Sequence, residues 1–315
     1  MRTRASSSTL ILTNEQDHSP KIEIGSRLWA LAFSADGEYL ISGDDEAVRV
    51  QRIKDAKEMA TLPAGIVNCL AASPDDTCIA AGTNDGTAFL WNATTYQQVF
   101  ARDSEDSRYL NAVDFSPDSS QLVAASDNGK ATIWDVKSGK QMQILSHPSQ
   151  VLAAKYSPQG DRIATATCRA VRVWDSSDGR LLVDIQVTVA AYYNTGLVWS
   201  NNHLLVISDG RIKQFEASTG SAVAEWPAPD TCGLSCIAVP KHGEFIAYST
   251  NHTVTLWQSL TRTQLALIQH PEDICSIALS PDDRFLAIGG VRGKIHIKAI
   301  SRNKVRVMFF RIRRT

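Results

Sequence analysis

Apolar and polar residues alternate along most of the chain in short runs that are separated by polar turns. One phrase recurs: an alternating run, the turn Ser-Pro-Asp or a variant of it, a second apolar run, a polar turn, and a third run that ends in an aromatic residue. Alternation with a period of two is typical of β-strands, and no stretch sustains the 3.6-residue period of a helix. The copies begin at Leu28, Val67, Leu110, Val151, Gly196, Leu234 and Ile274.

The position that closes the third run recurs at nearly constant spacing, from 40 to 43 residues. It falls at Gln51, Trp91, Trp134, Trp174, Phe215, Trp257 and Lys298. A fourth apolar run follows, as Gln141 to Leu145 does after Trp134-Asp135. Turn residues separate the runs, with Pro at second turn positions and Gly or Asn where the backbone needs a positive φ. Seven units of four short strands predict an all-β repeat fold.

These units resemble WD repeats, a family whose repeats have 40 to 45 residues, four strands and a closing Trp-Asp. Seven of them imply a seven-bladed β-propeller of four-stranded antiparallel blades. A length of 315 residues alone favours two domains, whereas the repeat favours one. We expect an N-terminal segment, 1–20, that is partly disordered, a WD-repeat propeller, 21–301, and a basic C-terminal strand or tail, 302–315.

The chain departs from the hydrogen-bonded set that often fastens WD-repeat blades, a His, a Ser or Thr, an Asp and the Trp. The His position holds only His147 and His270, the turn Asp is kept at Asp85, and no unit keeps the whole set. Burial of one Leu or Val contributes about 1.5–3 kcal/mol, against ~0.5–1.5 kcal/mol for a net hydrogen bond. We therefore expect burial to carry most of the stability and His147 to be structural.

Two segments fit the strand that would close the ring. Lys21 to Ile24 precedes the first unit, and Lys304 to Phe309 follows the last. Both cannot occupy the same position. We favour closure by the N-terminal segment, because an unpaired sheet edge between the first and last blades is an aggregation hazard.

No motif of catalytic or cofactor chemistry occurs in the sequence. GxSxG, HExxH and a glycine-rich phosphate loop are absent, and the seven histidines never cluster at metal-ligand spacing. The six cysteines form no CxxC pair, and most lie in apolar runs typical of buried thiols in a reducing compartment. We expect no enzyme activity, no cofactor and no bound metal. The expected location is the cytoplasm, with the nucleus as the alternative.

The fold class favours a non-catalytic interaction scaffold, which presents a rigid face to protein or peptide partners in a multiprotein assembly. We expect a monomeric propeller, alone or within a larger complex. Loops that lead into the first strands share one face with those that join the second and third strands, and binding concentrates on such loops. Trp, Tyr and Arg dominate interface hot spots. The candidates are Trp29, Asn68 and Asn111 at the channel mouth, Arg108 and Tyr109 in a charged loop, and Tyr192 and Tyr193 in an insertion.

We expect Trp29, Arg108, Tyr109 and Tyr193 to lie on one face and to be at least partly exposed. The competing interpretation is that Trp29 and Tyr192 pack against neighbouring blades.

Two narrower functions stay open. Residues 302–315 contain six Arg or Lys and no acid, which favours binding of anionic lipid or nucleic-acid phosphates through Arg311, Arg313 and Arg314. The run from Leu122 to Lys137 resembles the WDxR box of substrate-receptor subunits of cullin-RING ubiquitin ligases, although Asn128 replaces its acidic turn residue. Generic WD repeats meet most of that pattern through the fold alone.

Overall fold

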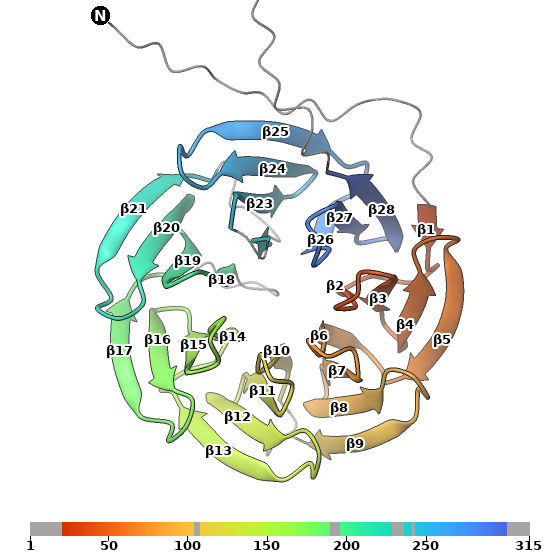
Figure 1. Ribbon diagram of the computed structural model, residues 1–315, viewed down its shortest axis with the longest axis horizontal. Coiled ribbons are helices and arrows are strands. Elements are labelled where there is room, and N and C mark those ends of the chain that lie inside the picture. Colours follow the sequence, from red (N-terminus) through yellow and green to blue (C-terminus); the bar gives the residue numbers. More distant parts are fainter. Residues whose placement is uncertain (1–20, 104–107, 190–195, 229–235, 241–242, 301–315) are drawn as a thin grey trace, which may run out of the picture.

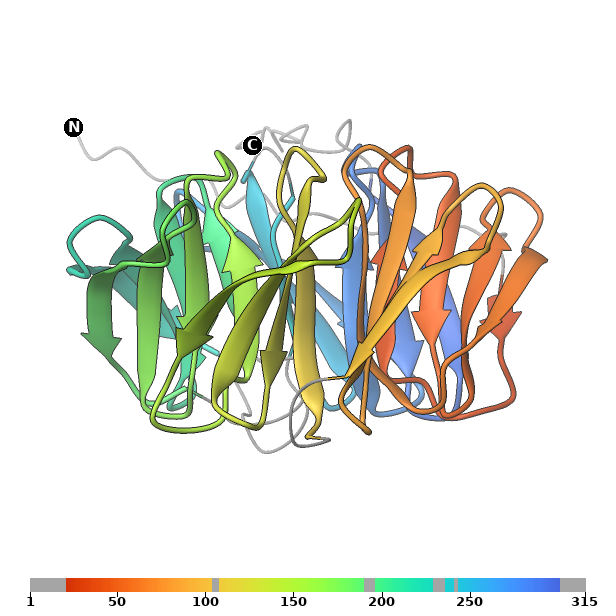
Figure 2. The ribbon, with the colours of Figure 1, turned by 90° about the horizontal axis from the view of Figure 1, so that it is seen from below.

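The chain folds as a ring of seven four-stranded antiparallel sheets (Figure 1). The computed structural model describes residues 21–103, 108–189, 196–228, 236–240 and 243–300. All regular structure in these ranges is strand and turn, with no helix. Figure 2 shows the ring from the side, as a thick disc with loops on two opposite faces. The predicted seven-bladed β-propeller is confirmed.

In blades 1 to 3 the strands follow the sequence from the central channel outward. Blade 1 comprises β2 (Ala30–Phe33), β3 (Tyr39–Gly43), β4 (Ala47–Arg52) and β5 (Lys57–Pro63). Blade 2 comprises β6 (Val67–Ala72), β7 (Cys78–Thr83), β8 (Thr87–Asn92) and β9 (Gln98–Asp103). Blade 3 comprises β10 (Leu110–Phe115), β11 (Gln121–Ser126), β12 (Lys130–Asp135) and β13 (Gln141–Ser146).

Blades 4 to 6 keep this order, and blade 7 takes its outermost strand from the start of the chain. Blade 4 comprises β14 (Ala153–Tyr156), β15 (Arg162–Ala166), β16 (Ala170–Asp175) and β17 (Leu181–Gln186). Blade 5 comprises β18 (Leu197–Ser200), β19 (His203–Ser208), β20 (Arg211–Glu216) and β21 (Ala222–Pro227). Blade 6 comprises β22 (Ile237–Ala238), β23 (Phe245–Thr250), β24 (Thr253–Gln258) and β25 (Gln264–Gln269). Blade 7 comprises β26 (Ile274–Leu279), β27 (Phe285–Gly290), β28 (Lys294–Ala299) and β1 (Lys21–Glu23).

The closing position of each sequence unit lies in the third strand of its blade. Trp134 pairs with Leu122 of the second strand in blade 3, and Trp174 pairs with Ile163 in blade 4. In blades 1 to 6 the ladder to the fourth strand shifts register at this same position. The period of the closing position therefore marks the place where the outer strand of each of blades 1 to 6 shifts register.

The recurring Ser-Pro-Asp turn joins the first and second strands through a repeated set of hydrogen bonds. In blade 2 the Ser73 hydroxyl donates to Asp75 Oδ1 at 2.6 Å and accepts the Cys78 backbone N–H at 2.9 Å. Blades 1, 3 and 7 have the same arrangement around Ser34, Ser116 and Ser280. These acids therefore cap the turns.

Most apolar side chains are buried between neighbouring blades. Seven clusters each combine residues from two adjacent blades, and one of them joins Val123 and Leu145 of blade 3 to Ile163 and Trp174 of blade 4. A blade therefore covers its faces only when both neighbours are present, and the ring has to close.

The N-terminal strand closes the ring, as predicted. Lys21, Ile22 and Glu23 of β1 pair with His296, Ile295 and Lys294 of β28. Ile22 is 4% exposed and belongs to the cluster between blades 7 and 1. The competing segment, 304–309, lies outside the described residues.

Replacing Ile22 by Ala is expected to lower the free energy of unfolding by about 2–4 kcal/mol, because it removes a buried side chain at the closure. The matched change Glu23→Ala alters an exposed residue of the same strand and should stay within about 0.5 kcal/mol. Urea denaturation measures both. Deleting residues 1–25 should likewise cost far more stability than deleting 302–315, and the reverse order would reject N-terminal closure.

Candidate functional site

One face of the propeller, which we call the upper face, carries the loops that lead into the innermost strands and the turns between second and third strands. Backbone hydrogen bonds fasten these loops to the turns: Val67 N–H donates to Asp44 O at 2.9 Å, and Val151 N–H donates to Ser126 O at 3.0 Å. These bonds link each loop to the blade before it. The upper face is therefore a surface with a fixed backbone, which lowers the ordering cost of binding.

Trp29 lies on this face in blade 1 and is partly exposed. Its indole N–H donates to Asp45 Oδ1 at 2.6 Å, and the exposed Arg27 guanidinium lies 4.1 Å from the centre of its ring. The Trp29 backbone N–H donates to Gly43 O at 2.9 Å. A cation stacked on an indole is attracted by the ring quadrupole, so this arrangement holds the aromatic surface in place.

Arg108 and Tyr109 lie on the same face in blade 3 and are exposed, Tyr109 by 43%. The Tyr109 carbonyl accepts the backbone N–H of Asp127 at 3.0 Å, which fixes the loop against the turn between β11 and β12. Trp29, Arg108 and Tyr109 therefore lie on one face and are at least partly exposed, as expected. Tyr192 and Tyr193 lie outside the described residues, as do Arg311, Arg313 and Arg314.

Asn68 and Asn111 are more buried than a contact site needs, at 6% and 7% exposed. Each lies at a register shift in the innermost strand, between Val67 and Cys69 or between Leu110 and Ala112. Such a bulge breaks the alternation on which the sequence expectation rested. Asn111 Nδ2 donates to Asp127 Oδ1 at 2.6 Å and to Val151 O at 3.0 Å, so this side chain connects blade 3 to blade 4.

The central channel holds a cavity of about 150 Å³. Its lining includes Asn111 but comes mainly from residues one or two positions further along the innermost strands, such as Leu70, Val113 and Ile277. Lys155 also lines it, and its ammonium group lies 2.9 Å from Asp114 Oδ1. Most of the side chains that line the channel are thus apolar, and one ion pair lies beside them.

An acidic group around Arg49 is a feature that the sequence reasoning missed. The Asp44 carboxylate is fully buried and accepts Arg49 Nε at 2.6 Å and the Glu46 and Ala47 backbone N–H groups at 2.8 Å each. Burial alone would raise the pKa of Asp44, but these bonds outweigh it and hold the pKa below its ordinary value. Glu58 Oε2 also lies 3.6 Å from Arg49. In the sequence, the three acids at residues 44–46 begin five positions before Arg49, and this spacing was the signal that could have revealed the group.

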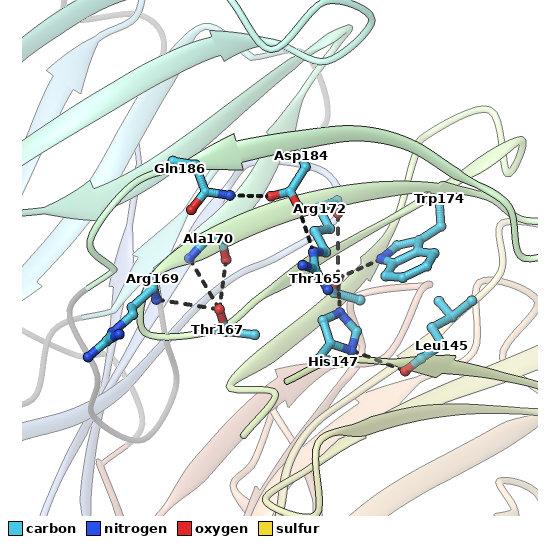
Figure 3. Close-up of polar contacts among 10 residues, drawn as sticks. All are labelled: Leu145, His147, Thr165, Thr167, Arg169, Ala170, Arg172, Trp174, Asp184 and Gln186. Atoms are coloured by element: carbon cyan, nitrogen blue, oxygen red, sulfur yellow. Dashed lines mark hydrogen bonds and ion pairs between the residues drawn. The ribbon is translucent and has the colours of Figure 1, made fainter. Parts of the chain in front are cut away.

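His147 is structural, as predicted, and its contacts appear in Figure 3. Its Nδ1 lies 3.1 Å from the Leu145 carbonyl and its Nε2 lies 2.8 Å from Thr165 Oγ1, which also accepts the Trp174 indole N–H at 2.8 Å. Because a carbonyl only accepts, Nδ1 carries the proton and Nε2 accepts from Thr165. The Leu145 carbonyl thus pairs with His147 Nδ1 in a blade whose turn between β15 and β16 has no Asp.

His270, the other histidine at this position, has different surroundings. Ile288 and Lys298 of blade 7 occupy the places that Thr165 and Trp174 have in blade 4. The His270 ring is buried, packs 4.7 Å from the His296 ring, and has Nδ1 2.9 Å from the Glu272 carbonyl. Burial lowers the pKa of His270, so the ring is held neutral by its packing.

The described ranges contain no group of three or more His, Cys, Asp or Glu side chains placed to hold a metal ion. Nor do they contain a helix long and apolar enough to cross a membrane. Burial raises the pKa of the Cys69 thiol to about 12 and that of Cys236 to about 11. Such thiols are neutral at ordinary pH and are poor nucleophiles.

The fold and the closing aromatic residues define a seven-bladed propeller of the WD-repeat class. Residues 27–299 match the model of the family described as the IFT122 first beta-propeller, and the chain belongs to that family. Propellers of this class generally act as protein-binding scaffolds without catalysis.

Several curated proteins are similar over shorter stretches. The small ribosomal subunit protein RACK1y of Oryza sativa subsp. japonica is 27% identical over 190 residues, which are 57% of this chain and 44% of that protein. WD repeat and SOCS box-containing protein 1 of Xenopus tropicalis is 37% identical over 68 residues, 21% of this chain and 16% of the relative. Actin-interacting protein 1 of Drosophila melanogaster is 24% identical over 159 residues, 48% and 26% of the two chains. The matches thus span less than half the length of these relatives.

Replacing His147 by Ala is expected to lower the melting temperature at pH 7 by about 2–8 °C, because Thr165 and Trp174 lose a shared partner. Burial, and then the charge of Arg172, lower the pKa of His147 from 6.5 to about 4. A buried neutral histidine stabilises the fold fully above pH 6.5, and about 2–3 kcal/mol of that contribution is lost as the pH falls to 4.

The deficit of the variant should therefore shrink on acidification. Thermal unfolding of both proteins at several pH values between 7 and 4 tests this. An unchanged melting temperature at pH 7 contradicts the structural role of His147.

Proposed function

We propose that this chain is a non-catalytic scaffold that binds protein partners through its upper face. The observation that carries the proposal is a pair of aromatic and arginine groupings on that face. Arg27 and Trp29 form one in blade 1, and Arg108 and Tyr109 form the other in blade 3. Residues of these types account for most of the binding energy in protein interfaces.

The rigidity of the face supports the proposal. Both groupings lie on backbone that is hydrogen-bonded within the blade, through Trp29 N–H to Gly43 O at the end of β3 and through Asp127 N–H, in the turn after β11, to Tyr109 O. A side chain presented by a fixed backbone loses little further entropy on binding. The family supports the same role, because its members share the propeller that presents such a face.

The narrower functions have less support. The basic tail lies outside the described residues, so binding of anionic lipid or nucleic acid through it stays a prediction. In the segment that resembles a ligase box, Asp135 Oδ1 accepts the Ser138 backbone N–H at 2.7 Å and so caps the turn after β12. That local role accounts for Asp135 without a ligase partner.

The test is affinity purification of the full chain with quantitative mass spectrometry, in parallel with the double variant Arg108→Ala, Tyr109→Ala. Recovery of specific partners should fall about tenfold or more in the double variant, because both changes remove hot-spot side chains. Leu260→Ala is the control, since Leu260 is 90% exposed on the opposite face. The same partners at the same recovery from the double variant would contradict a role for this grouping.

A further inference from the structure

The lower face, which carries the turns between first and second and between third and fourth strands, has a pocket between blades 1 and 2. The pocket measures about 410 Å³, within the range of about 300–1,000 Å³ that is usual for binding pockets. Its wall is mainly apolar and aromatic. The side chains that form it include Tyr39, Ile41, Met59, Ile79 and Tyr96.

The pocket lies where one blade lacks a large side chain. The residue at the end of the first strand lies in the apolar cluster between its own blade and the preceding one. It is larger than alanine in every blade except blade 2, which has Ala72. In blade order, the seven residues are Phe33, Ala72, Phe115, Tyr156, Trp199, Val239 and Leu279.

Tyr156 shows what this position does in a filled interface. Its ring is packed between blades 3 and 4, and its hydroxyl donates to Gln121 Oε1 at 2.9 Å. Tyr39, the first residue of β3, is the counterpart in blade 1 of Gln121, the first residue of β11. Between blades 1 and 2, Tyr39 and Ala72 both line the open space of the pocket.

Tyr96 forms another wall of the pocket at the cost of an unfavourable backbone conformation. Its φ is +59°; at the corresponding turn position blades 3, 4 and 5 have Gly139, Gly179 and Gly220, and blades 1 and 6 have Ala56 and Arg262, all with positive φ. A Cβ at Gly139 would lie 2.9 Å from Phe100 of the preceding outer strand. The position of Phe100 is taken in β5 by Ala60, which leaves room for the Tyr96 side chain. Arg262 has the same conformation in blade 6, so the distinguishing feature of Tyr96 is that its side chain lines the pocket.

The rim of the pocket is acidic. Asp36 and Asp76 both line it, and Asp76 Oδ1 accepts the Ala35 backbone N–H at 2.5 Å. Burial, and then the nearby charge of Asp36, raise the pKa of Asp76, so the two carboxylates repel each other. The Arg52 guanidinium, at the end of β4, is paired with a different acid: its Nη2 and Nε lie 2.6 and 3.0 Å from the Asp55 carboxylate oxygens. A cation brought by a partner would relieve the repulsion between the two acids.

We propose that this pocket binds an extended peptide segment of a partner protein that presents an aromatic side chain next to an Arg or Lys. The ring would fill the space that Phe115, Tyr156 and Trp199 fill in other interfaces, and the cation would lie against Asp36 and Asp76. The site is on the face opposite Trp29 and Tyr109, so it is independent of the proposed upper-face scaffold. It gives the propeller a second docking position.

Fluorescence anisotropy with the full chain tests the proposal. The probes are three labelled peptides with one Gly-Ser host sequence and a central Phe-Arg, Ala-Arg or Phe-Glu. Phe-Arg should bind about tenfold tighter than either of the others, because only it supplies both the ring and the cation. Equal binding of Phe-Arg and Ala-Arg overturns the proposal.

Ala72→Phe should abolish binding of the Phe-Arg peptide without lowering the melting temperature, because it supplies the side chain that other blades have. Leu279→Phe is the matched control, which places the same ring at the same position in blade 7 and should leave binding unchanged. Tyr96→Gly removes one wall while relieving the backbone, so it should fold and still bind weakly. Asp76→Asn should reduce the preference for Phe-Arg over Phe-Glu.

Other occupants give different results. Suppose that the unmodified chain dimerises but does not bind the peptide, and that Ala72→Phe abolishes the dimer. A second copy then fills the pocket, and the proposal fails. It also fails if the peptide binds only after Phe309 and Phe310 are replaced by Ser, because the chain's own tail then competes. The upper-face variants of Arg108 and Tyr109 should leave peptide binding unchanged, so the two proposals can fail separately.

Discussion

Burial of apolar side chains between adjacent blades is the interaction on which the rest of this structure depends. Each blade is a single sheet, and a single sheet has no second layer of its own to cover its faces. The clusters therefore always combine two blades, as Leu90 of blade 2 and Leu122 of blade 3 do. Stability in such a fold accumulates from neighbour to neighbour, and one unclosed interface would expose the faces of two blades at once. This is why a strand of three residues at the start of the chain has so large a structural role.

This dependence on burial also explains why the hydrogen-bonded set of WD repeats can be incomplete. Blade 4 keeps His147, Thr165 and Trp174 but has no turn Asp, and a backbone carbonyl pairs with His147 Nδ1. Blade 7 keeps only the histidine, and Lys298 stands in place of the Trp. Both blades still bury their central strands almost completely, with Ile163 and Leu286 at 0% exposed. The hydrogen-bonded set adds stability to individual blades, whereas burial of the apolar strands holds the ring together.

The sequence predicted the features that repeat and failed where a single blade differs. The spacing of the closing position predicted seven blades, and the turn around Ser73 and Asp75 was foreseeable because its side chains act within a few residues of each other. The depth of Asn68 and Asn111 was not foreseeable, because a bulge at each of them breaks the alternation of the strand. Asp44 and Arg49 lie within one hairpin, so their proximity was foreseeable. The sequence did not show that the Asp44 carboxylate is buried.

A repeat fold makes such exceptions informative, because the other blades show which residues each position has. Ala72 on its own is an unremarkable small residue, and Tyr96 on its own is an ordinary turn residue. Compared with blade 3, Ala72 replaces Phe115 and Tyr96 replaces Gly139, and both residues line one pocket; blades 1 and 6 also lack glycine at the Tyr96 position, with Ala56 and Arg262. Ala72 and Tyr96 both have a price for stability, since the first leaves a void between blades and the second holds a bulky residue at positive φ. A void beside Ala72 with an acidic rim of Asp36 and Asp76 is the space that the proposed peptide would fill.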